Sequence, residues 1–253
     1  MKAVITGASS GIGTDMARIL SQMGYDLIIT ARREDRLKKL AGELPTNVTV
    51  IPADLSKAEN CLEFFEKIKD EDFDFAINNA GFGIFGDFSE TALETELDMI
   101  DLNVTALHIL TKKFLEYFEK KGSGRILNVA SSAGLMPGGP LMSSYYATKA
   151  YVVSLSRGIY EELRKKKSPV KISVLCPGPV NTEFNSVAGV SFSLKGLDSY
   201  ETAKYAIKKT LKNKTIIIPG LSIKLAYIMN RLAPSKIALR IAYKIQKKKS
   251  EQG

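Results

Sequence analysis

The stretch that decides the fold is residues 2–13, KAVITGASSGIG, near the start of this 253-residue chain. Lys2–Thr6 is a short apolar run of the kind that forms a buried strand. A glycine-rich turn with the spacing G-x3-G-x-G follows, and a helical pattern continues over 12–23. In this order, backbone N–H groups and a helix N-terminus can receive a pyrophosphate. The stretch predicts a dinucleotide-binding turn, although a plain turn could carry the same glycines.

Further strand and helix patterns alternate along the chain without a linker rich in Pro, Gly or Ser. Strands are expected near 2–6, 26–30, 48–53, 73–77, 125–130, 170–176 and 215–218. Helices are expected near 12–23, 34–43, 57–70, 92–121 with one break, 144–166 and 200–212. This alternation predicts an α/β fold with a doubly wound, Rossmann-type parallel sheet of about seven strands and helices on both faces. Residues 1–219 would form one catalytic domain, although the length alone would allow two.

The composition of the chain argues against several classes of enzyme and site. The chain holds one histidine, His108, in an apolar stretch, so a Ser-His-Asp hydrolase or a histidine-rich metal enzyme is hard to build. Cys61 and Cys176 are too few for a disulfide framework and fit reduced core thiols in the cytoplasm. We expect no metal site, no signal peptide and no membrane-spanning helix.

Tyr145 and Lys149 lie four residues apart at the start of a predicted helix, so their side chains project from one face. A nearby ammonium favours the phenolate and would lower the tyrosine pKa from about 10 toward neutrality. This spacing is common by chance, and a surface pair is the plain alternative. Four other segments of the chain favour a catalytic role for this pair.

Four segments together with the turn resemble the short-chain dehydrogenase/reductase family, from Met1 to about Thr182. They are TGASSGIG at 6–13, NNAG at 78–81, the serines before Tyr145, YYATK at 145–149 and PGPVNT at 177–182. The resemblance implies an enzyme with a catalytic tetrad of Asn103, Ser132, Tyr145 and Lys149. Ser132 is favoured over its neighbour Ser131, which stays open as an alternative.

The resemblance also implies a nicotinamide cofactor and a mechanism. Hydride would pass to a carbonyl carbon while Tyr145 donates a proton to the oxygen, with the reverse in oxidation. Lys149 would lower the Tyr145 pKa and hold the ribose, Ser132 would bond the substrate oxygen, and Asn103 would hold a water. The implied cofactor-binding residues are Gly7, Ser9, Ser10, Gly11, Ile12, Gly13, Arg32, Arg33, Asp54, Asn79, Ala80, Gly81, Tyr145, Lys149, Pro177, Gly178, Val180 and Thr182.

The end of the second strand predicts NADP(H) rather than NAD. Ala31 stands where NAD-binding proteins carry an acid, and Arg32 and Arg33 follow. A guanidinium binds phosphate in a bidentate manner, so Arg32 is expected to hold the 2′-phosphate with Arg33 assisting. The alternative is that Arg33 begins the next helix and faces solvent. An NAD-dependent dehydrogenase of small alcohols, or a non-catalytic nucleotide-binding scaffold, is the rival function.

Apolar residues surround the expected site and predict a hydrophobic carbonyl substrate of fatty-acyl, steroid-like or aromatic type. They are Phe82, Phe85, Met136, Leu141, Met142, Phe184, Val187, Val190 and Phe192. Residues 183–199 are expected to form a substrate lid, and the apolar residues could equally serve only to pack it. A homo-oligomer, dimer or tetramer, is expected through the helices near 101–121 and 144–166.

Residues 220–253 form a basic, amphipathic helical extension. Residues 202–250 contain thirteen Lys and Arg and no Asp or Glu, whereas the whole chain carries +9. Three interpretations stay open for its apolar stripes. They could cover the domain or a partner subunit, or lie peripherally on an anionic membrane surface through 220–249. Nucleic-acid binding is disfavoured, because no recognised module accompanies the charge.

Overall fold

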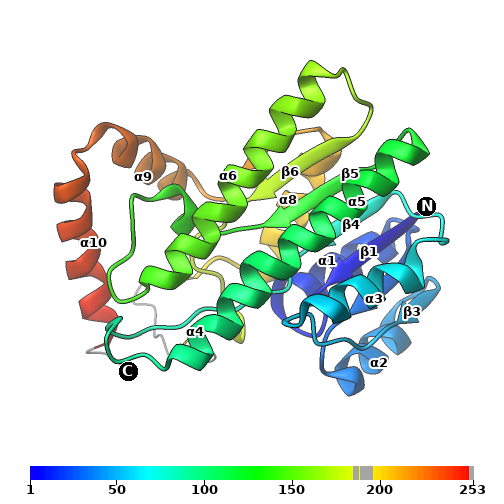
Figure 1. The fold of residues 1–253 in the computed structure, drawn as a ribbon, viewed down its shortest axis with the longest axis horizontal. Coiled ribbons are helices and arrows are strands. Elements are labelled where there is room, and N and C mark those ends of the chain that lie inside the picture. The colour runs from blue at the N-terminus through cyan, green and yellow to red at the C-terminus, as the bar shows by residue number, and fades with distance from the viewer. Residues whose placement is uncertain (185–187, 189–195, 251–253) are drawn as a thin grey trace.

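The computed structural model describes residues 1–184, 188 and 196–250. Within them, seven strands form one parallel sheet in the order β3-β2-β1-β4-β5-β6-β7, which confirms the predicted Rossmann-type α/β fold (Figure 1). The strands are β1 Lys2–Thr6, β2 Asp26–Thr30, β3 Val48–Val50, β4 Phe75–Asn78, β5 Arg125–Val129, β6 Lys171–Leu175 and β7 Ile216–Ile217.

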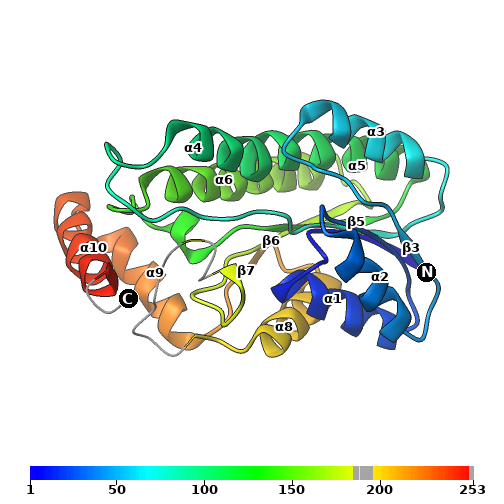
Figure 2. The same cartoon turned by 90° about the horizontal axis from the view of Figure 1, so that it is seen from below.

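Helices cover both faces of this sheet (Figure 2). On one face, α1 (Gly11–Gln22), α2 (Glu34–Glu43) and α8 (Ser199–Leu211) pack against the strands, and on the other lie α3 (Ala58–Ile68), α5 (Leu107–Lys121) and α6 (Ser143–Lys165). Because both faces are covered, the central strands are buried almost throughout rather than on alternate residues. The parallel register places the carboxyl ends of β1, β4, β5 and β6 along one edge.

The predicted break within 92–121 is a change of helix type. Helix α4 (Leu93–Ile100) passes into a π-helix over Asp101–Ala106, which passes directly into α5. Insertion of a π-turn into an α-helix shifts its side chains by one position and often occurs at functional sites. Asn103 lies at the centre of this turn and is completely buried.

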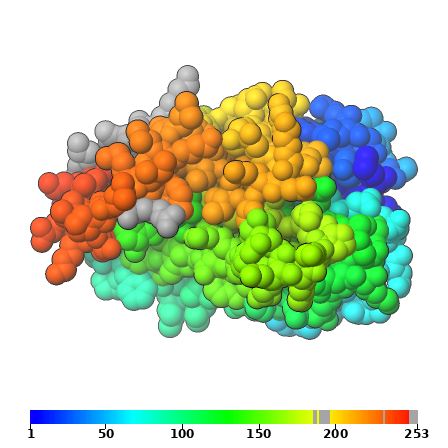
Figure 3. Space-filling model, turned by 90° about the horizontal axis from the view of Figure 1, so that it is seen from above, coloured from blue at the N-terminus to red at the C-terminus, as the bar shows by residue number. Residues whose placement is uncertain are grey.

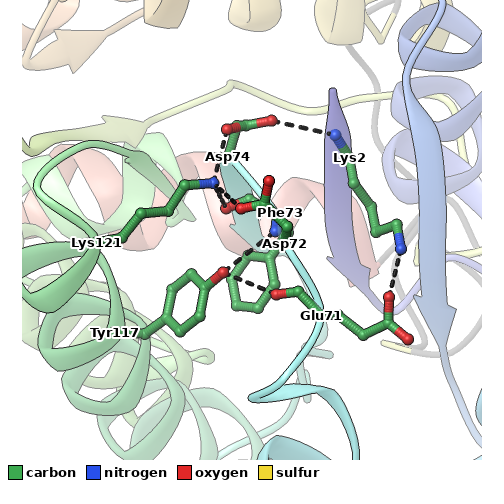
Figure 4. Close-up of polar contacts among 7 residues, drawn as sticks. All are labelled: Lys2, Glu71, Asp72, Phe73, Asp74, Tyr117 and Lys121. Atoms are coloured by element: carbon green, nitrogen blue, oxygen red, sulfur yellow. Dashed lines mark hydrogen bonds and ion pairs between the residues drawn. The ribbon is translucent and has the colours of Figure 1, made fainter.

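Polar contacts fix the amino ends of β1 and β4, at the edge opposite the glycine turn (Figure 4). Lys121 Nζ donates 2.9 Å bonds to the Phe73 carbonyl and to Asp74, and pairs with Asp72 at 2.5 Å. Tyr117 stacks on the Phe73 ring with centroids 4.1 Å apart. These contacts attach the loop before β4 to the end of α5 and so anchor the amino end of the sheet.

After β7, the predicted amphipathic extension forms two helices, α9 (Leu221–Leu232) and α10 (Ser235–Ser250). They lie together at one end of the molecule, beyond the sheet (Figure 3). Pro234 separates them, as expected for a residue that cannot continue a helix. The boundary between domain and extension at residue 219 remains a prediction.

Candidate active site

A cavity of about 480 Å³ opens at the carboxyl edge of the sheet, where ligands bind in doubly wound folds. The structure brings nearly all sequence-predicted site residues to its wall. Those lining it are Gly7, Ser9, Ser10, Gly11, Ile12, Arg32, Arg33, Asp54, Asn79, Ala80, Gly81, Ser132, Tyr145, Lys149, Pro177, Gly178, Val180 and Thr182. Gly13 and Asn103 do not line the cavity but lie behind it.

The glycine turn can receive a pyrophosphate. Gly7 and Gly11 have φ values of +67° and +56°, a backbone conformation that residues with a side chain rarely adopt. Helix α1 begins at Gly11, its N-cap Ser10 makes no side-chain capping bond, and its first turn contains no acid. The helix N-terminus is thus left with unused N–H donors and a positive partial charge facing the cavity. These features fit a bound dinucleotide.

Asn79 fastens the loop after β4 to this turn. Its Nδ2 donates to the carbonyls of Thr6 and Gly7 at 3.0 and 3.1 Å. In return, Thr6 Oγ1 accepts from the backbone N–H groups of Asn79 and Ala80. A Cβ at Gly7 would lie 2.7 Å from the Ala80 Cα, so no larger residue fits there. The two loops therefore form one rigid floor.

The basic residues after β2 differ in their surroundings. Arg33 caps α2, yet its guanidinium turns back over the glycine turn, donating to Ser9 Oγ at 3.2 and 3.3 Å. It also pairs with Glu183 at 2.9 Å, and Arg36 pairs with the same carboxylate at 2.6 Å. Arg32 is exposed and lines the cavity wall. Arg33, expected only to assist, is thus the arginine anchored over the turn, and Glu183 is a neighbour that the sequence pattern did not indicate.

Asp54 lines the cavity beyond these arginines. Its Oδ1 accepts hydrogen bonds from the backbone N–H and the hydroxyl of Ser56, at 3.2 and 2.9 Å. These bonds orient the carboxylate in the segment that follows β3. It is one of the residues that the family resemblance implies for cofactor binding.

Tyr145 and Lys149 lie together on the first turns of α6, and both are buried. The ammonium lies 5.9 Å from the centre of the tyrosine ring, and its Nζ donates to the Val129 carbonyl at 3.2 Å. Burial raises the pKa of Tyr145 to about 12, and it lowers the pKa of Lys149 to about 8. Loss of solvation thus decides the direction of the Tyr145 pKa in this structure, and the expected lowering by Lys149 is not seen.

Ser131, rather than Ser132, reaches the tyrosine hydroxyl. A side-chain hydrogen bond between Ser131 and Tyr145 opposes the effect of burial by lowering the Tyr145 pKa. Ser131 Oγ also accepts from the Ala133 N–H at 3.1 Å, which starts the 3-10 turn Ser132–Leu135. Both serines line the cavity. This interaction favours Ser131, the alternative that the sequence left open, as the partner of Tyr145, and the catalytic role of Ser132 remains a prediction.

Asn103 acts as a clamp between three elements. Its Nδ2 donates to the Phe82 carbonyl at 2.8 Å and to Thr148 Oγ1 at 3.1 Å, while Oδ1 accepts from the Phe82 N–H. Both amide protons are therefore committed to protein partners. A Cβ at Gly81 would lie 2.6 Å from Asn103 Oδ1 and 3.2 Å from Lys149 Nζ. The side chain thus positions the loop beside Lys149, and the expected water relay remains a prediction.

The outer wall of the cavity is apolar. Phe82, Met142 and Phe184 line it, and the Phe184 ring lies 5.4 Å from that of Tyr145. Phe85 packs behind them in the same cluster. Met136 and Leu141 do not line the cavity, and Val187, Val190 and Phe192 in the expected lid lie outside the described residues.

One lining residue comes from the C-terminal extension. Gln246 on α10 is buried and donates to Tyr146 Oη at 2.9 Å. No sequence motif marks it, because the hydrogen bond joins residues 100 positions apart. The extension is therefore part of the wall of this site as well as an addition to the fold.

The remaining titratable candidates lie elsewhere. Cys61 and Cys176 are buried free thiols, and burial raises the pKa of each to about 12, as expected for core cysteines. His108 is exposed on α5 and contacts the Tyr151 hydroxyl at 2.7 Å. Within the described part of the chain, no three His, Cys, Asp or Glu residues gather into a metal-binding group.

Comparison with known proteins identifies the class. The family model for short chain dehydrogenase matches residues 1–191, and the chain belongs to this family of oxidoreductases. It is 32% identical over 227 residues to a curated relative, dehydrogenase/reductase SDR family member 11 of Gallus gallus, covering 85% of this chain and 89% of the relative. The protein is thus an oxidoreductase that uses a nicotinamide cofactor and acts on CH–OH or C=O groups.

Solved structures agree with this assignment. A short-chain dehydrogenase from Sphingobium yanoikuyae in complex with NADPH is 29% identical, with TM-score 0.81 over 91% of this chain and 93% of that one. The bulky-bulky ketone specific alcohol dehydrogenase from Comamonas testosteroni is 28% identical, with TM-score 0.76 over 91% and 92%. A family member from Burkholderia phymatum in complex with NAD has TM-score 0.83 over 91% and 92% at 23% identity, which shows the fold alone.

The two serines allow a matched mutational test. We expect Ser131→Ala to lower kcat by about a hundredfold, because a donor to developing negative charge is lost. Ser132→Ala should change kcat by less than about threefold, within ordinary surface effects. Steady-state kinetics of both variants provides the measurement, and the reverse order would restore Ser132 to the site.

Burial of Lys149 predicts a pH-dependent stability. Its pKa is lower in the folded chain than in the unfolded one, so the unfolded chain binds more protons between pH 8 and 10. Lys149 should therefore contribute about 2 kcal/mol of rising stability across this window, opposed by the fall that the two buried thiols contribute. Urea unfolding at pH 8 and pH 10 should show that Lys149→Met lowers the difference in free energy of unfolding between the two pH values by about this amount. The exposed Lys165→Met should leave that difference unchanged, and equal differences in the two variants would contradict the burial effect.

Proposed function

We propose that the protein is an NADP(H)-dependent reductase of hydrophobic ketones or aldehydes. The observation that carries the proposal is the Arg33 guanidinium, held over the glycine turn by Ser9, with Ala31 rather than an acid at the end of β2. A 2′-phosphate at this point would meet Arg32 and Arg33, whereas no carboxylate at residue 31 offers itself to the ribose of NAD. The NADPH complex of the Sphingobium relative supports this choice.

Tyr145 would be the proton donor. A phenol whose pKa lies near 12 stays protonated at neutral pH, which suits donation to a carbonyl oxygen as hydride reaches its carbon. Ser131 would donate a hydrogen bond to the same oxygen as negative charge develops there. Lys149, with its pKa near 8, keeps its proton at pH 7 and would hold the nicotinamide ribose hydroxyls. Asn103 would act as a positioning residue for the loop at Gly81.

The apolar wall supports a hydrophobic substrate. Phe82, Met142 and Phe184 would bury its hydrocarbon part, while Tyr145 and Ser131 supply the polar groups that orient its carbonyl. The specificity of the Comamonas relative for bulky-bulky ketones points the same way. We further propose that α5 and α6 provide the contact of a homo-oligomer, since residues such as Tyr151 and Tyr160 are partly exposed along α6.

A screen of NADPH consumption tests the proposal. Carbonyl compounds of graded hydrophobicity should show kcat/KM rising with apolar size. Tyr145→Phe should abolish turnover while still binding NADPH, because the phenol is lost without touching the nucleotide turn. Turnover restricted to small polyols with NADH would favour the alternative, an NAD-dependent dehydrogenase of small alcohols. Undiminished turnover in Tyr145→Phe would exclude the proposed proton donor.

The Glu183 contacts predict how the cofactor is selected. Arg33→Ala should weaken NADPH binding by about tenfold or more, with little change for NADH, since a charge-assisted phosphate contact is lost. Glu183→Gln should strengthen NADPH binding severalfold, because the carboxylate competes with the phosphate for Arg33. Arg36→Ala is the matched control for Arg33→Ala and should not cause the loss of NADPH binding. Arg36 also pairs with Glu183, but it does not line the cavity. Fluorescence titration with both cofactors gives the answer, and equal losses for NADH and NADPH would contradict it.

A further inference from the structure

The outer surface of the C-terminal helices is both apolar and basic. On α10, Ile237, Ile241 and Ile245 are 52%, 53% and 49% exposed and recur every four residues, so they form one stripe. Lys236, Arg240 and Lys244 form a second exposed stripe directly beside it. On α9, Leu225, Ile228, Met229 and Leu232 are also more than half exposed. We call this combined outer surface of α9 and α10 the terminal face.

The inner side of these helices is already occupied. Ala238 and Gln246 on α10 are buried, and Gln246 reaches the cavity through Tyr146. On α9, Ile223 and Tyr227 pack against the core cluster beneath β6 and β7. The exposed isoleucines and leucines therefore do not serve to attach the helices to the domain. They are surplus apolar surface of a kind that marks an interaction site.

Charge indicates what this surface meets. No Asp or Glu occurs anywhere in residues 202–250, so the terminal face has no acid of its own beside its cations. Pairing this face with its copy in a second chain would oppose like charges, which costs free energy. An anionic lipid surface offers the complementary charge and an apolar layer just beneath it. Lysine and arginine can extend to the headgroups while the neighbouring isoleucines enter that layer.

We propose that the terminal face binds an anionic lipid bilayer and lies in its interface. Among the helices described, none is long and apolar enough to span a bilayer, so the contact is a surface one. The helix that touches the lipid is the same helix that supplies Gln246 to the cavity wall. Binding of the terminal face to lipid is independent of which cofactor or substrate the cavity holds.

Vesicle flotation of the full-length protein tests the proposal. The protein should float with vesicles of phosphatidylcholine and phosphatidylglycerol, should not float with phosphatidylcholine alone, and should dissociate in high salt. The triple variant K236Q/R240Q/K244Q should lose about a hundredfold in partitioning, since each cation contributes near an anionic surface. The control K39Q/K120Q/K165Q removes the same charge from exposed lysines elsewhere and should keep its binding.

An apolar pair completes the test. I237S/I241S should weaken partitioning by about tenfold. M23S/L62S should not, although Met23, just after α1, and Leu62, on α3, are each 44% exposed. Thermal melts check that all variants are folded. Absence of flotation, equal binding to neutral vesicles or equal loss in the control triple would overturn the proposal. If the protein binds no vesicles and sedimentation shows a dimer that I237S/I241S converts to monomer, the terminal face would instead be the contact with a second copy.

Discussion

The tie between Asn79 and the turn after β1 is the constraint on which the site is built. Two carbonyls of the turn accept from one side-chain amide, and the backbones approach so closely that Gly7 admits no side chain. This contact holds the carboxyl ends of β1 and β4 at a fixed separation. The uncapped start of α1 is thereby aimed into the cavity, and Gly81 is brought beside Lys149. The Asn79 side chain thus holds the glycine turn in place from behind and leaves its cavity side open to a ligand.

Sequence periodicity was sufficient to predict the layered sheet. The strands at Lys2–Thr6 and Asp26–Thr30 have the predicted bounds, because continuous apolar runs bounded by turn residues leave little freedom in a doubly wound fold. One break within 92–121 was predicted, but neither its position at Asp101–Ala106 nor its π-helical character was. A π-turn leaves no compositional mark, and the partners of Asn103 at its centre, Phe82 and Thr148, are remote in the sequence.

The site was predicted where motifs are local and was missed where contacts are remote. The position of Tyr145 relative to Lys149 follows from helix geometry. The direction in which the Tyr145 pKa shifts follows from burial, which the tertiary fold decides. The choice between Ser131 and Ser132 depended on how β5 ends, and spacing along the chain could not settle it. Glu183 and Gln246 reach the cavity from segments 150 and 100 residues away from their partners. No periodic pattern connects such residues.

The Gln246–Tyr146 bond has a consequence for the order in which the site is assembled during synthesis. A nascent chain that has emerged from the ribosome only as far as β7 already contains the nucleotide floor and the tyrosine. It lacks the wall that α10 supplies, and its cavity would be open on that side. Residues near the carboxyl end of α10 therefore complete the wall of a cavity whose tyrosine lies a hundred positions earlier in the chain.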